Sequence, residues 1–80
     1  METTDYVPID CGLYSEYELI IMHRNRLQLS WRDAAGDAHI GIVTPTDLNT
    51  CEGAEFMAVT GRDGATFTIR LDRIMQFARV

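Results

Sequence analysis

Carboxylates and tyrosines gather in the first eighteen residues of this 80-residue chain, where no basic residue occurs. These residues are Glu2, Asp5, Tyr6, Asp10, Tyr14, Glu16, Tyr17 and Glu18. The first arginine follows only at Arg24. Carboxylates can occupy the places of phosphates and tyrosine rings the places of bases, so the segment suits a partner whose basic site holds nucleic acid. The pattern therefore favours binding to a protein in competition with RNA.

Other residues of catalytic or metal-binding type lie too far apart to form a familiar site. The side chains that zinc prefers are those of Cys11, His23, His39 and Cys51. No two of them are closer than twelve positions, whereas structural zinc sites pair ligands about two to four residues apart. Serines and histidines occur without a nucleophile elbow or a Gly-rich phosphate loop. We therefore expect no metal, no cofactor and no enzymatic activity.

Length, charge and hydropathy limit what the chain can be. Eighty residues make a single domain over residues 1–80. With twelve acidic residues against seven arginines, the net charge of −5 opposes direct binding to nucleic acid. No apolar run approaches the roughly 18 residues of a membrane span, and residues 1–5 lack the basic start of a secretory signal. We expect a cytoplasmic protein in which Cys11 and Cys51 are free, partly buried thiols.

The chain is expected to begin with an extended arm over residues 1–9 and a short helix over residues 10–18. The proline of the arm disfavours helix before it and fixes its own φ angle. Asp10 is a good N-cap, because its carboxylate can accept hydrogen bonds from the free amides of the first turn. Leu13 and Tyr17, four positions apart, would share the face that packs on the rest of the domain.

After the helix the pattern changes to that of strands. An apolar run at residues 19–22 predicts the first strand, and strict alternation at residues 27–32 predicts the second. Glycine-containing loops at residues 33–37 and 61–64 are typical of hairpins. Residues 44–47, with a proline after a threonine, predict a capped helical turn.

Six short strands over residues 19–80 cannot bury both faces of a flat sheet in so small a chain. Curling into a small barrel or β-sandwich removes most exposed edges and encloses one apolar face. The predicted fold class is therefore mainly β with one N-terminal helix. Trp31 is expected in the core or at an open edge of the barrel. The predicted core consists of Ile21, Leu27, Leu29, Ile40, Ile42, Phe56, Ala58, Phe67, Ile69, Leu71, Ile74 and Phe77.

Three short motifs carry a resemblance to a known family. They are Tyr6-x-Pro8-Ile9-x-Cys11-x-x-Tyr14, the following Glu18-Leu19, and the late Ile69-Arg70-Leu71-Asp72-Arg73-Ile74. In this order and spacing the chain resembles the Rof (YaeO) family of Rho-binding antiterminators, from about Tyr6 to Phe77. The resemblance implies a small Sm-like barrel with an N-terminal helix, and the last motif is similar to the second Sm motif.

The resemblance also implies a function and a partner. Rof-like proteins inhibit Rho, the hexameric helicase that terminates bacterial transcription, by binding its N-terminal OB-fold region and blocking its primary RNA-binding site. The family's contact region falls on residues 10–18 of this chain. The partner-binding residues expected here are Asp10, Tyr14, Ser15, Glu16 and Glu18. Family members often have acids where this chain has Gly12, Leu13 and Ser15, so the contacts differ in detail.

Two alternatives stand beside this hypothesis. The acidic residues near the helix start can simply be solvated and compensate the helix dipole, and Tyr14 can cover the end of the barrel. The runner-up function is an Sm-like RNA-binding or oligomeric scaffold protein that uses Arg70 and Arg73. Asp63 and Asp72 dilute the positive charge there, and arginines in such a setting are more simply ion-paired surface residues.

Overall fold

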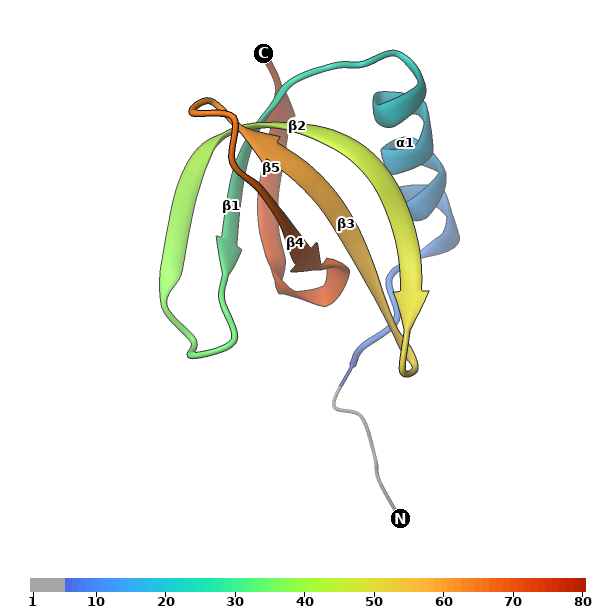
Figure 1. Ribbon diagram of the computed structural model, residues 1–80. Coiled ribbons are helices and arrows are strands. Elements are labelled where there is room, and N and C mark those ends of the chain that lie inside the picture. Colours follow the sequence, from blue (N-terminus) through green and yellow to red (C-terminus); the bar gives the residue numbers. More distant parts are fainter. Residues whose placement is uncertain (1–5) are drawn as a thin grey trace.

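The computed structural model describes residues 6–80, which form one helix and a five-stranded antiparallel sheet (Figure 1). The helix is α1 (Cys11–Met22), and the strands are β1 (Leu27–Arg32), β2 (Ala38–Cys51), β3 (Ala54–Gly61), β4 (Thr66–Arg70) and β5 (Ile74–Arg79). A short 3₁₀ helix, η1 (Leu71–Arg73), joins β4 to β5. The prediction of a mainly β fold with one helix is confirmed. Glu2 and Asp5, part of the predicted acidic segment, lie outside the described residues.

The helix is longer than predicted. Asp10 caps it, since its side chain accepts a 3.2 Å hydrogen bond from the Leu13 amide. Residues 19–22, predicted as the first strand, form the last turn of α1, so the sheet has five strands and not six. The prediction was wrong because Tyr17 and Ile20, three positions apart, are both buried in the core. This is helical spacing, which a short apolar run does not reveal by itself.

The strands follow the order β4-β3-β2-β1-β5, so β4 and β5 are the edges of the sheet. The long strand β2 pairs with β1 through its first half and with β3 through its second half. Val43 lies at the join and faces Leu27 on one side and Gly61 on the other. The sheet curves strongly in Figure 1, as expected for a small barrel or β-sandwich, but it is not closed, since β4 and β5 are not neighbours in the order given above.

A bulge in β2 stands where a capped helical turn was predicted. The register passes from Pro45 opposite Val59 to Asp47 opposite Ala58, which leaves Thr46 as an extra residue. The predicted turn over residues 44–47 is therefore wrong. A proline is tolerated at a bulge because it has no amide hydrogen to give to the ladder, and Pro45 is fully buried there.

The core lies between α1 and the concave face of the sheet. Its buried apolar members are Tyr17, Ile20, Leu27, Leu29, Val43, Ala54, Met57, Val59, Ile69 and Leu71. The core positions predicted at Leu27, Leu29, Ile69 and Leu71 are therefore confirmed. Ile74 and Phe77 pack against this cluster while only partly buried.

In β2 and β3 the prediction put the wrong set of alternating residues on the inner face of the sheet. In β2, Ile40 is 69% exposed, and in β3 the buried residues are Met57 and Val59 and not their predicted neighbours. In β4, Phe67 is 38% exposed. In β2 and β3 apolar residues occur on both faces, so alternation alone cannot identify the inner one. The other predicted core residues, all partly buried, are Ile21, Ile42, Phe56 and Ala58.

Two further expectations concern thiols and membranes. Cys11 and Cys51 are free, as predicted, but both are exposed and not partly buried. Across residues 6–80, no helix has the length and apolar character needed to cross a membrane.

Candidate protein-binding groove

A groove runs along one flank of α1, between the helix and the second half of β2. Its lining consists of Tyr14, Glu18, Ile21, Met22, Asp47 and Leu48, and this set is named the acidic groove. Tyr14 and Glu18 are four positions apart on α1, so they share this flank. The C-terminal half of β2, drawn in yellow in Figure 1, lies alongside the helix.

The bulge in β2 puts Asp47 on the surface. Val43 and Pro45 are buried before the bulge, and strict alternation would send Asp47 into the core after them. The extra residue Thr46 shifts the alternation by one position, so that Leu48 packs on the core and Asp47 is exposed. One irregularity in the strand thus supplies both an apolar wall and a carboxylate to the groove.

Three carboxylates act on the hydroxyl group of Tyr14. Partial burial raises the pKa of Tyr14, and the negative charges of Glu55, Glu18 and Asp47 raise it further. These charges come from three different elements, β3, α1 and β2. None of the residues lining the groove is basic. Such a site attracts a cation on an apolar stem, as in arginine or lysine.

Tyr14 has a structural role as well. Its ring is partly buried and packs against the core, which agrees with the alternative interpretation of a tyrosine that covers one end of the sheet. The neighbouring side chains of Leu19 and Met22 are 48% and 70% exposed. The acidic groove therefore has an apolar rim, and exposed apolar groups next to charges are common where proteins bind one another.

The other predicted contact residues lie outside the groove. Asp10 caps the helix through its side chain, and Ser15 is exposed to solvent. Glu16 pairs with Arg79 of β5 at 3.3 Å, and both side chains are almost half exposed. An exposed pair of this kind contributes little to stability. Of the five predicted residues, the structure brings together only Tyr14 and Glu18 in the acidic groove.

Asp47, which lines the groove, and Glu55, whose charge acts on Tyr14, were both missed in the sequence. Their strands meet the helix only through the tertiary fold, and no spacing along the chain links them to Tyr14. A weak signal was present at Pro45, because a proline inside an otherwise strand-like segment is typical of an edge or a bulge.

The segment before the helix is fastened to the sheet by Tyr6 and Val7. The Tyr6 hydroxyl donates a 2.9 Å hydrogen bond to Oε1 of Glu55, and the Val7 amide donates one of 3.0 Å to Oδ2 of Asp72. Burial, then the hydrogen bond and charge of Glu55, raise the pKa of Tyr6 to about 12. The hydrogen bond fixes the carboxylate of Glu55, whose negative charge also acts on Tyr14.

Arg70 is engaged with Asp72 and Tyr6. Its Nε donates to Oδ1 of Asp72 at 2.6 Å and its Nη2 to Oδ2 at 3.0 Å. The two side chains are only 13% and 8% exposed, and the guanidinium lies 5.8 Å from the centre of the Tyr6 ring. A bidentate pair buried to this degree does not leave the guanidinium open to a phosphate. The structure therefore favours the ion-paired interpretation of Arg70 over a role in binding RNA.

Histidines and cysteines do not meet at a metal site. His39 contacts Asp33, with Nε2 and Oδ2 2.7 Å apart. In the part of the chain that the structure describes, no three side chains of His, Cys, Asp or Glu lie close enough to hold a metal ion.

Comparisons with known proteins bear on the fold and not on the family. No family model matches the chain, and no curated protein matches its sequence significantly. Among solved structures, the chain is similar in fold to part of the proteasome accessory factor B/C (PafBC) of Arthrobacter aurescens, with a TM-score of 0.77 and 15% sequence identity. The match covers 96% of this chain and 12% of that one. At this level of identity the likeness shows the fold alone.

Proposed function

We propose that this chain is a cytoplasmic, Rof-like inhibitor of Rho-dependent transcription termination. It binds the N-terminal OB-fold region of the Rho hexamer and keeps RNA off the primary site, and it makes or breaks no bond. Two lines of evidence support the proposal: the resemblance in sequence motifs, and the chemistry of the acidic groove. The observation that carries it is that the partly buried ring of Tyr14 lines one groove together with the carboxylates of Glu18 and Asp47.

The acidic groove has the chemistry of a substitute for RNA. A site that binds single-stranded RNA offers arginines and lysines for phosphates, and flat surfaces on which bases stack. Glu18 and Asp47 supply negative charge where phosphates would lie, and Tyr14 supplies a ring with a hydroxyl donor. The net charge of −5 adds long-range attraction toward a basic partner and speeds the encounter.

The usual strength of such contacts favours several weak interactions over one anchor, since Glu18 and Asp47 are both exposed. An exposed carboxylate–arginine pair contributes about 0–1 kcal/mol, whereas removing one partner of a desolvated pair costs about 2–5 kcal/mol. The ring of Tyr14 is already held by the core, so little conformational entropy is lost when it is covered. We expect binding in the micromolar range or tighter that weakens as salt screens the carboxylates.

The test of this proposal is displacement of RNA. Purified Rho is loaded with a fluorescent pyrimidine-rich RNA and titrated with the chain, and a termination assay is run with and without it. The expected results are release of the RNA and increased read-through of Rho-dependent terminators. RNA that stays bound at saturating concentrations of the chain would overturn the proposal.

Matched variants test the assigned surface. Tyr14→Ala combined with Glu18→Arg should weaken displacement at least about tenfold, because the ring and one charge are lost together. Glu16→Arg makes the same change of charge on the other flank of α1, and it should leave displacement nearly unchanged. Tyr14→Phe separates the ring from the hydroxyl, and circular dichroism verifies that each variant is folded. Equal losses from Glu16→Arg and Glu18→Arg would show that overall charge matters and not the groove.

A further inference from the structure

A second cleft lies away from α1, between the edge strand β4 and the hairpin that joins β1 to β2. Its lining includes Trp31, Arg32, Asp33, His39, Phe67 and Arg73, and this set is named the aromatic cleft. No residue of α1 contributes to it. The cleft has a volume of about 470 Å³, within the range of about 300–1,000 Å³ that is usual for small-molecule sites.

Three rings form one wall of the aromatic cleft. The Trp31 ring of β1 lies 5.4 Å from that of His39 in β2, nearly parallel at 18°, and 5.8 Å from that of Phe67 in β4, tilted by 32°. Each ring comes from a different strand, so the sheet fixes their positions. Phe67 is 38% exposed and the side chain of His39 is 45% exposed. Rings left open to water in this way offer a surface on which another flat ring can stack.

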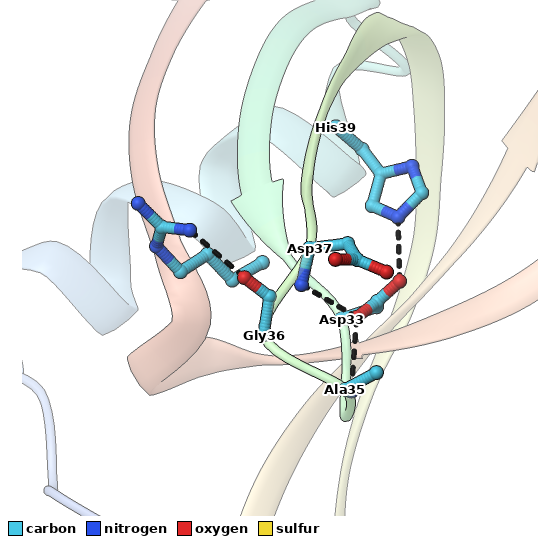
Figure 2. A network of polar contacts seen from close by, with 6 residues as sticks. Asp33, Ala35, Gly36, Asp37 and His39 are labelled. Atoms are coloured by element: carbon cyan, nitrogen blue, oxygen red, sulfur yellow. Dashed lines mark hydrogen bonds and ion pairs between the residues drawn. The ribbon is translucent and has the colours of Figure 1, made fainter.

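Hydrogen bonds hold the loop beside this wall (Figure 2). The Asp33 side chain accepts from the amides of Ala35 at 2.9 Å and Asp37 at 3.0 Å, and its other oxygen contacts His39 at 2.7 Å. The Arg32 guanidinium donates to the carbonyl of Gly36 at 2.9 Å. The loop is therefore ordered before any ligand arrives, and ordering in advance lowers the entropy cost of binding.

The aromatic cleft is a basic spot on an acidic protein. Three of the seven arginines, Arg32, Arg70 and Arg73, line this cleft, against the single carboxylate of Asp33. Asp72 neutralises Arg70, and Arg32 uses part of its donor capacity on the loop. Within residues 6–80, the side chain of Arg73 makes no hydrogen bond or ion pair. Its charge is therefore available to an anion next to the rings.

We propose that the aromatic cleft binds a nucleotide, with the base stacked on the wall of Trp31, His39 and Phe67 and the phosphate paired with Arg73. A flat ring and an anion within one small molecule match the two features of the cleft. The net charge of −5 opposes a long polyanion, so we expect recognition of one nucleotide. It can be a free nucleotide or the end of a single strand. This activity is separate from the proposed inhibition of Rho.

The test uses the intrinsic fluorescence of Trp31, which is the single tryptophan of the chain. The full chain, without Rho, is titrated with nucleoside monophosphates, with the corresponding nucleosides, and with inorganic phosphate. We expect saturable quenching by a monophosphate, at least about tenfold weaker binding of its nucleoside, and no quenching by phosphate. Absence of saturable quenching by every monophosphate would overturn the proposal, and so would equal affinities for nucleoside and nucleotide.

Variants show which residues form the site, and a second ligand shows whether it takes a free nucleotide or the end of a strand. Arg73→Gln and Phe67→Ala should each weaken binding about tenfold, while Arg62→Gln, in the loop between β3 and β4, should leave it unchanged. Equal losses from Arg62→Gln and Arg73→Gln would overturn the assignment. A short single-stranded oligonucleotide gives the last arm: affinity equal to that of the monophosphate indicates a free nucleotide, and tighter binding indicates the end of a strand.

Discussion

The ring of Tyr17 in α1 lies 5.2 Å from the ring of Phe77 in the edge strand β5, tilted by 58°. Tilted pairs at this spacing contribute about 0.5–1.5 kcal/mol beyond the area they bury. We expect a coupling free energy of that size in a double-mutant cycle of Tyr17→Leu and Phe77→Leu. The free energy of unfolding of the four proteins, measured in urea, supplies the cycle. Additive losses would show that the rings pack without specific interaction.

Alkaline pH should destabilise the fold. Burial raises the pKa of Tyr6 and of Tyr17 from the ordinary value of 10 to about 12. The folded state therefore holds these protons more tightly than the unfolded state does. Their contribution to stability is fully present below pH 10 and is lost as the pH rises from about 10 to about 12. Urea unfolding at about pH 9 and about pH 11 measures the loss.

The variant Tyr17→Phe provides the control for this pH dependence. It removes one of the two raised groups, so its stability should fall less steeply above pH 10 than that of the wild-type chain. Equal slopes for the two proteins would contradict the assignment of the loss to Tyr17.

The helix cap at Asp10 should contribute about 1 kcal/mol to the free energy of unfolding, within a range of about 0.5–2 kcal/mol. Asp10→Ala removes the acceptor of the Leu13 amide and should lower stability by that amount. Asp10→Ser keeps a capping oxygen without the charge, and it should restore most of the loss. If both variants displace RNA from Rho as well as the wild type does, Asp10 acts through the helix and not by contact.

Two side-chain truncations test which residues of β3 and β2 face the core. Met57 is 0% exposed and Ile40 is 69% exposed. Met57→Ala should lower the free energy of unfolding by about 2–5 kcal/mol because it leaves a cavity, whereas Ile40→Ala should change it by less than about 0.5 kcal/mol. Chemical denaturation of both variants provides the comparison. A larger loss from Ile40→Ala would mean that the faces of β2 are reversed.

Sequence reasoning succeeded where structure depends on near neighbours. The cap at Asp10 and the hairpin loops at residues 33–37 and 61–64 follow from turn and capping chemistry that acts over a few residues. The inward positions of Leu27 and Leu29 follow from clean alternation with polar neighbours. Residues 19–22 were assigned wrongly because four apolar residues satisfy a strand and a buried helical turn equally well, and only packing on the sheet decides between them.

The candidate site was predictable to the same extent. Tyr14 and Glu18 are one helical turn apart, so the sequence suffices to put them on one flank. Asp47 joins them only because an extra residue at Thr46 rotates the strand, and Glu55 joins them through strand pairing. Both effects depend on contacts between distant parts of the chain. The aromatic cleft was missed for the same reason, because Phe67 of β4 meets Trp31 and His39 only through the tertiary fold, since β3 separates β4 from β2 and β1 in the sheet.

The length of β2 has a consequence for how the two surfaces are used. Asp47 of the acidic groove and His39 of the aromatic cleft lie on this one strand, eight positions apart, on either side of its bend (Figure 1). A large molecule docked at one end thus leaves room for a small one at the other. If both proposals hold, the two ligands should bind a single copy simultaneously, and a ternary complex is expected.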